Sequence, residues 1–244
     1  MTHDFSKGEH LPKRLDGRPA HDPYDLPRQR RGVTPQMHGR YPEWDVLEQA
    51  PHWDEVTRDL VLERARTTPP IRFFDAEQAR TLEAFCNTVT AQDSEPRVPV
   101  LAMVDKKLHE GKLDGYRYHD MPKDTETWKL VARGLDEAAA AQGAGSFAEL
   151  DLEQRREVCG RVADGKLAGG VWEDLPCSKA WSVVMRAVLS EFYSHPWAWN
   201  EIGYAGPAYP RGYMRMNQGE KEPYEADEAV SADPVGKGRQ EDLA

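Results

Sequence analysis

The sequence contains few cysteines and no motif that uses them in pairs. Only three of its 244 residues are cysteine, Cys86, Cys159 and Cys177, and their spacing is too wide for a CxxC redox pair or a zinc knuckle. CxxCH is absent, which excludes covalently attached haem. We expect three reduced, buried thiols. One intramolecular pair with a free thiol, or one disulfide to a partner, are the alternatives.

Long hydrophobic runs and excess basic charge are also lacking. No segment is long and apolar enough to span a bilayer, and the N-terminus has no apolar signal region. The net charge of -10 and the pI near 5.3 argue against nucleic acid or an anionic membrane surface as partner. Arg30 and Arg31 begin like a twin-arginine export signal, but polar residues follow them. We therefore expect a protein without membrane insertion and without a nucleic-acid partner.

Motifs that carry chemistry are missing as well. No stretch alternates as a strand does, so no GxSxG, Walker or GxGxxG loop follows a predicted strand. HExxH and helical ExxH pairs are absent too. The sequence thus predicts no catalytic residue, no metal ligand and no cofactor-binding residue in this chain. The alternative is a stand-alone ligand- or metal-binding enzyme with a pocket near His119 and His195.

The sequence has helical periodicity in its middle and biased composition at its ends. We predict an all-α fold with a small helical domain at residues 44–215. Residues 1–43 are Pro-rich and aperiodic, typical of a long extended arm that is either a solvated tail or laid along a partner. Residues 216–244 contain eight acidic residues against three basic ones and few apolar ones, which predicts a short disordered acidic tail.

Apolar stripes and caps predict the individual helices. Residues 44–66 form one expected helix, with Trp44, Leu47, Trp53, Val56 and Leu60 on its buried side. Capping-box patterns begin at residues 75, 146 and 151, and Pro residue 176 suits the first position of a helix. The further helices are expected at 75–89, 100–110, 124–141, 152–164 and 176–192.

The stretch at residues 192–213 combines aromatic side chains with Pro and Gly, which predicts an ordered irregular loop. Rigid aromatic rings on a loop are typical of protein contact sites. The predicted partner-binding residues are Trp197, Trp199, Asn200, Tyr204, Tyr209, Arg211 and Tyr213. In the alternative interpretation Trp197, Trp199 and Ile202 pack on their own helical core.

This stretch also carries a family resemblance. It reads Phe192-Tyr-Ser-His-Pro-Trp-Ala-Trp-Asn-Glu-Ile-Gly-Tyr-Ala-Gly-Pro-Ala-Tyr-Pro-Arg-Gly-Tyr213. It resembles the C-terminal signature of the gluconate 2-dehydrogenase subunit 3 family, and the similarity extends more loosely back to about residue 71.

The resemblance implies a small helical subunit without a redox centre. Such a subunit binds and stabilises a large flavoprotein of the glucose-methanol-choline (GMC) type, which acts on a sugar, a sugar acid or a related alcohol. FAD is expected in that partner and no cofactor in this chain. A transient assembly or export chaperone is the alternative. Many family members begin with a twin-arginine signal, which this chain lacks, so we expect a cytoplasmic complex or export with a partner that carries the signal.

Overall fold

The computed structural model describes residues 44–92, 95–113, 115–215 and 222–226. The predicted arm at residues 1–43 and most of the predicted tail lie outside these ranges. Every regular element within them is a helix, which confirms the all-α prediction. The described residues form two compact units: unit 1 holds 44–67, 95–98, 193–215 and 222–226, and unit 2 holds 68–92, 99–113 and 115–192.

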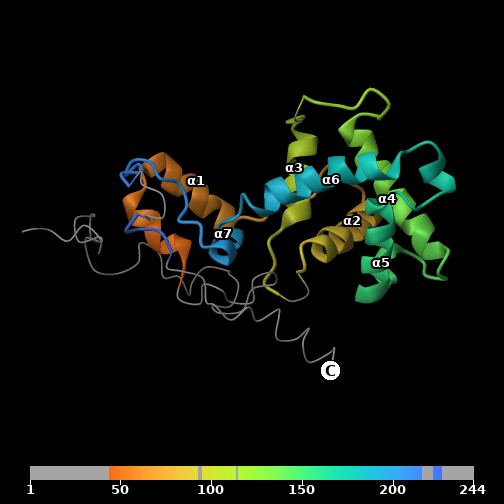
Figure 1. The fold of residues 1–244 in the computed structure, drawn as a ribbon, viewed down its shortest axis with the longest axis horizontal. Helices are drawn as coiled ribbons and strands as arrows, with labels where there is room; N and C mark the ends of the chain where they lie inside the picture. The colour runs from red at the N-terminus through yellow and green to blue at the C-terminus, as the bar shows by residue number, and fades with distance from the viewer. Residues whose placement is uncertain (1–43, 93–94, 114, 216–221, 227–244) are drawn as a thin grey trace, which may run out of the picture. The chain divides into compact units, whose positions relative to one another are not determined.

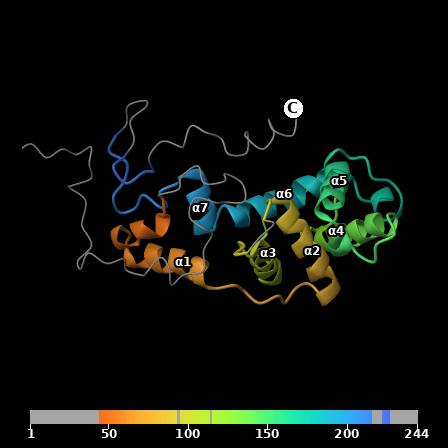
Figure 2. The same cartoon turned by 90° about the horizontal axis from the view of Figure 1, so that it is seen from below.

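Unit 2 is a cluster of five α-helices with two short 3-10 turns (Figures 1 and 2). The helix α2 contacts α3, α4 and α5, and α6 contacts the same three helices. Large apolar side chains from several helices are fully buried between them, as their periodic stripes predict. The elements are α2 (Ala76–Val89), α3 (Val100–His109), α4 (Asp124–Ala140), η3 (Phe147–Glu149), α5 (Leu152–Ala163), η4 (Gly170–Glu173) and α6 (Cys177–Phe192).

Two helices of unit 2 begin at complete capping boxes. The Asp75 carboxylate accepts the N–H of Gln78 at 2.8 Å, and the Gln78 side chain accepts the Asp75 N–H at 3.4 Å. Asp151 and Gln154 repeat this arrangement at the start of α5. Both predicted boxes are confirmed. The box predicted at Ser146 is wrong, because its side chain makes no capping bond and a 3-10 turn follows.

A buried carboxylate fixes the entry to α2. Asp105 on α3 is fully buried and accepts the backbone N–H groups of Arg72, Phe73 and Phe74 at 2.8, 2.9 and 3.0 Å. Buried carboxylates require such partners, because an unpaired charge is strongly disfavoured away from water. This one side chain therefore holds the segment before α2 against α3.

Unit 1 is built from η2 (Val46–His52), α1 (Glu55–Arg66) and α7 (Pro196–Ile202), which contact one another. Apolar side chains of the three elements form its core. The buried cluster consists of Val46, Leu47, Ala50, Trp53, Val61, Leu62, Ala65 and Trp199.

The single helix predicted at residues 44–66 is wrong in two respects. The chain forms two helices, because Pro51 lies in the first and Trp53 is extended (φ -87°, ψ 156°) before Asp54 starts the second. This break shifts the helical phase, so Val56 and Leu60 are 76% and 49% exposed rather than buried. Val61, Leu62 and Ala65 form the inner face of α1 instead.

The disordered tail predicted from residue 216 contains a packed segment. Glu222 and Tyr224 are each only 4% exposed. The Tyr224 ring lies 3.8 Å from the Arg211 guanidinium carbon, and its hydroxyl donates to the Gly212 carbonyl at 2.6 Å. One aromatic side chain therefore anchors residues 222–226 despite their acidic composition.

Cys86, Cys159 and Cys177 are all buried, as expected, and none is paired with another, so the alternative of an intramolecular disulfide gains no support. Burial raises the pKa of Cys159 to about 12, so its thiol stays protonated. Across the described ranges, no helix has both the length and the apolar character that a membrane span needs.

Candidate partner-binding surface

The predicted aromatic loop begins with a short helix, so the expectation of an entirely irregular segment is wrong. The helix α7 starts at His195, whose Nδ1 accepts the N–H of Trp197 at 3.2 Å, and Pro196 occupies its first turn. It ends at Gly203 with φ 67°. Pro at a helix start and Gly at a left-handed C-cap delimit a helix rather than break it.

His195 is an internal part of unit 1. It is 1% exposed, and burial lowers its pKa to about 3, so the imidazole is neutral near pH 7. Arg64 on α1 donates from Nη1 to the Ser194 carbonyl at 3.1 Å. These contacts join the start of α7 to the last turns of α1.

The two predicted anchor tryptophans are also internal. Trp197 and Trp199 are 4% and 6% exposed. The Trp199 indole N–H donates to the Tyr193 carbonyl at 2.6 Å, and its ring meets Tyr204 edge-on at 5.4 Å. This burial favours the interpretation in which both tryptophans pack on their own core, although Ile202 is 42% exposed.

Asn200 and Arg211 tie the aromatic segment to η2. The Asn200 side-chain oxygen accepts the N–H of Val46 at 2.7 Å, and its amide donates to Asp45 at 3.3 Å. Arg211 donates from Nη1 to Gln49 at 2.8 Å. Two predicted contact residues therefore also fix the loop within unit 1.

Two residues that sequence reasoning missed complete the anchoring of residues 211–215. Glu222 accepts the backbone N–H groups of Met214 and Arg215, and the Tyr224 hydroxyl donates to the Gly212 carbonyl. Burial raises the pKa of Tyr224 to about 12, so its hydroxyl remains a donor. The sequence signal for these two anchors was a single tyrosine, Tyr224, within an acidic segment.

The side chains that remain exposed on this anchored loop are mainly tyrosines. Tyr204 is 40%, Tyr209 67% and Tyr213 53% exposed, and Met214, which the sequence did not single out, is 72% exposed. We call these four residues the tyrosine face. Large exposed apolar groups on a fixed loop are the usual anchors of protein–protein contacts.

The alternative site near His119 and His195 gains no support. The His119 side chain is 95% exposed and lies 3.8 Å from Asp120 in unit 2, whereas His195 is buried in unit 1. Within the described ranges there is no group of three or more His, Cys, Asp or Glu side chains that could hold a metal ion.

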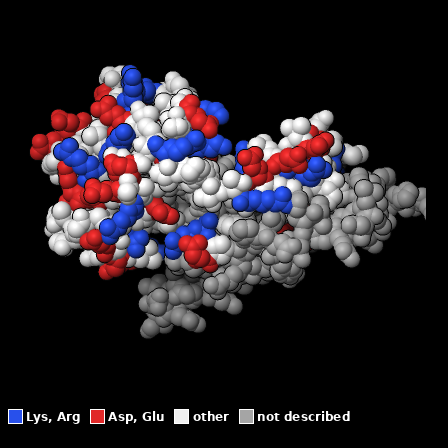
Figure 3. Space-filling model, turned by 180° about the vertical axis from the view of Figure 1, so that it is seen from behind, with Lys and Arg blue, Asp and Glu red and all other residues white. Residues whose placement is uncertain are grey.

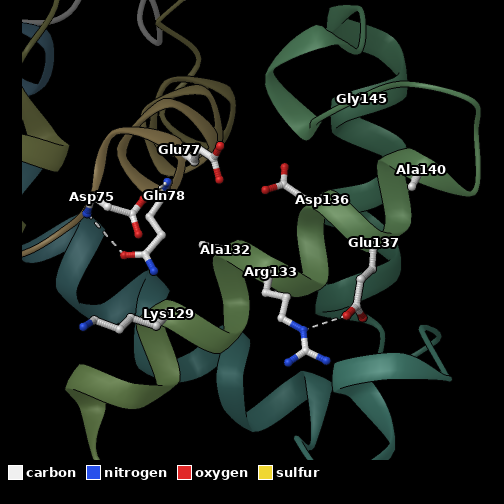
Figure 4. A pocket seen from close by; sticks show the side chains of 10 residues that line it. All are labelled: Asp75, Glu77, Gln78, Lys129, Ala132, Arg133, Asp136, Glu137, Ala140 and Gly145. Carbon is white, nitrogen blue, oxygen red and sulfur yellow. Dashed lines mark hydrogen bonds and ion pairs between the residues drawn. The ribbon is translucent and has the colours of Figure 1, made fainter.

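A polar groove of about 440 Å³ lies in unit 2 between the start of α2 and the face of α4 (Figure 4). Three of its four carboxylates already serve the fold: Asp75 caps α2, Asp136 accepts from Thr81 and the Phe147 N–H, and Glu137 accepts from Arg133 and the Val171 N–H. Small-molecule sites are mostly apolar with a few free polar groups. The groove does not have that character.

Charge is mixed on the one face of the described residues that Figure 3 shows. In the view of Figure 3, Lys and Arg side chains alternate with Asp and Glu side chains rather than gathering into a field of one sign. Among the described residues, the tyrosine face is therefore the candidate surface for a protein partner because its exposed rings lie on an anchored loop.

Comparison with known proteins shows the family to which this all-helical chain belongs. The family described as "Gluconate 2-dehydrogenase subunit 3" matches residues 76–206, which is more than half of the sequence. The chain belongs to this family, whose name implies a subunit of a multi-subunit dehydrogenase. No curated protein and no solved structure shows significant similarity to it.

Proposed function

We propose that the protein is a non-catalytic small subunit that binds and stabilises a large FAD-dependent oxidoreductase subunit of the GMC type. The partner oxidises a sugar, a sugar acid or a related alcohol and holds the FAD, while this chain holds no cofactor. The complex is cytoplasmic unless the partner carries an export signal. Family membership supports the subunit role, and the tyrosine face supports a protein partner.

The observation that carries the proposal is the contrast between a fixed loop backbone and its exposed rings. Asn200, Arg211, Glu222 and Tyr224 hold the backbone through hydrogen bonds to other segments of unit 1. A loop ordered before binding loses little conformational entropy on association, so each exposed ring contributes more to affinity.

The test is co-expression of the full-length protein with the large flavoprotein subunit, followed by affinity purification through the small subunit. The Tyr209→Ala, Tyr213→Ala double variant should retain about 10-fold less flavin absorbance than the unmodified protein, because it loses two exposed anchors. Tyr116→Ala is the matched control, since Tyr116 is an equally exposed tyrosine (54%) of unit 2.

Equal flavin yield from the double variant and the control would contradict the role of the tyrosine face. Absence of any flavoprotein with the unmodified protein would contradict the subunit role itself. The same purification separates a permanent subunit from a transient chaperone. A permanent small subunit stays in the purified complex, whereas a chaperone leaves the mature flavoprotein.

A further inference from the structure

The Arg211 guanidinium has one occupied edge and one unoccupied edge. Its Nη1 donates to Gln49 at 2.8 Å, and the Tyr224 ring lies 3.8 Å from its central carbon. Its Nε and Nη2 atoms are buried and have no hydrogen-bond partner among the described residues. These two atoms form the fork that binds a carboxylate through two parallel hydrogen bonds.

A buried guanidinium edge without an acceptor is energetically unfavourable within this chain. The neighbouring carboxylates are engaged elsewhere: Glu222 accepts from Met214 and Arg215, and Glu225 accepts the Glu222 N–H at 2.6 Å. The acceptor that Arg211 has, Gln49, is neutral. Arg211 is thus held in place by its surroundings while its charge has no carboxylate partner among the described residues.

Tyr213, a member of the tyrosine face, lies close to this guanidinium group. Tyr213 packs against Tyr224 with ring centroids 6.2 Å apart, and Tyr224 in turn stacks on Arg211. The Tyr213 ring is 53% exposed, so a partner that contacts it lies beside Arg211. An ion pair formed there lies near two aromatic rings, where exclusion of water strengthens it.

We propose that the Nε–Nη2 edge of Arg211 receives a carboxylate of the large partner subunit, from an Asp or Glu side chain or from the terminal carboxylate, beside Tyr213. This inference rests on the proposed function and names the chemistry of the partner segment. Gln49 and Tyr224 are positioning residues, because they fix the plane of the guanidinium. The bidentate pair sets the register of the contact, and the tyrosine face supplies its apolar area.

The test measures the dissociation constant of the full-length protein for the purified flavoprotein subunit in low and high salt. Arg211→Met should weaken binding by about 30-fold, and Arg211→Lys by about 10-fold, because lysine keeps the charge but not the fork. Binding of Arg211→Met should also depend less on salt than binding of the unmodified protein. A purely structural role for Arg211 leaves the salt dependence unchanged.

Arg58→Met is the matched control. Arg58 lies in the same unit, its removal changes the net charge equally, and it pairs with Asp59 at the surface at 3.3 Å. Its affinity should stay within about 2-fold of the unmodified protein. Thermal melting of the Arg211→Lys variant on its own verifies that unit 1 is folded.

The outcomes are distinguishable. If the unmodified protein binds and Arg211→Met binds as tightly, or with the same salt dependence, the carboxylate inference is overturned and the proposed function stands. If the unmodified protein binds no flavoprotein, both are overturned.

Discussion

The two units of the protein are stabilised in different ways. Unit 2 is held by periodic apolar stripes, two complete capping boxes and the buried carboxylate of Asp105. Unit 1 contains short helices whose positions depend on side-chain bonds across the sequence, such as Asn200 to Val46 and Arg211 to Gln49. Its described residues also include buried donors without partners, on Trp53, Trp197 and Arg211.

This difference indicates a division of roles. The described residues of unit 2 have nearly all of their buried polar side chains satisfied, so this unit has little need of a partner to satisfy them. A unit with exposed tyrosines and several unsatisfied buried donors is the one that gains from a partner. Four substitutions, two of them with a control substitution, and one change of pH test this contrast, beginning with the largest expected effect.

Replacement of Asp105 by Ala should destabilise unit 2 most. The change leaves the N–H groups of Arg72, Phe73 and Phe74 without their acceptor, which costs about 3 kcal/mol or more in unfolding free energy. Chemical denaturation followed by circular dichroism measures this. Asp59→Ala, at a side chain 65% exposed, is the control and should change stability by less than about 0.5 kcal/mol. Similar stability of both variants would refute the anchoring role of Asp105.

Replacement of Gly206 by Ala should destabilise unit 1 by about 2–3 kcal/mol. Gly206 has φ 76°, and an added Cβ would lie 2.6 Å from the Trp53 ring and 3.1 Å from Val46. Gly212 has a similar φ of 70° but open space around it, so Gly212→Ala isolates the backbone strain, about 1 kcal/mol. Hydrogen exchange of the unit 1 helices during denaturation follows unit 1, because both units contain tryptophans and their fluorescence does not separate the units. Equal effects of the two substitutions would show that the Trp53 contact is unimportant.

Acid should destabilise unit 1 through His195. Its pKa falls from 6.5 to about 3 on folding, mainly by burial, so below pH 6.5 the unfolded chain binds a proton that the folded chain excludes. The stabilising contribution is complete above pH 6.5 and is lost as pH falls toward 3, at up to about 1.4 kcal/mol per pH unit.

The His195→Asn variant retains a capping acceptor and does not titrate. Between pH 7 and about 5, its unfolding free energy should therefore fall by roughly 2 kcal/mol less than that of the unmodified protein. Parallel denaturation series at several pH values measure the difference. An identical pH dependence in the variant would contradict a neutral, buried His195.

Replacement of Tyr224 by Phe should have the smallest effect on stability, about 1 kcal/mol, because it removes one hydrogen bond to the Gly212 carbonyl and keeps the ring on Arg211. Hydrogen exchange at residues 211–215 should increase while exchange in unit 2 stays unchanged. Unchanged exchange at these residues would contradict an anchoring role for the Tyr224 hydroxyl.

The sequence was sufficient for most of unit 2. The stripes of α2, α3, α4 and α6 and the caps at Asp75 and Asp151 act over short sequence distances, so local pattern determines them. Unit 1 was harder to predict because Pro51 restarts the helical phase and because Val46 and Asn200, 154 positions apart, meet only in the folded state.

The candidate site stays a prediction, but the structure divides its aromatic residues into two groups. Aromatic composition pointed to residues 192–213, and the structure leaves Tyr204, Tyr209 and Tyr213 exposed within them. Composition alone could not separate these exposed rings from the buried Trp197 and Trp199, because tyrosine and tryptophan both occur in interfaces and in cores. Met214 and the anchors Glu222 and Tyr224 fall where composition alone indicated the end of the domain.

The most direct test of the proposed subunit role is the absorption spectrum and mass of the complex purified through the full-length protein. We predict a 1:1 or higher-order complex with a large subunit that contains FAD, with visible flavin absorbance, and a small subunit that has no cofactor of its own once the two are separated. Recovery of the small protein alone, or with a metal or small molecule bound to it, would contradict the proposed role.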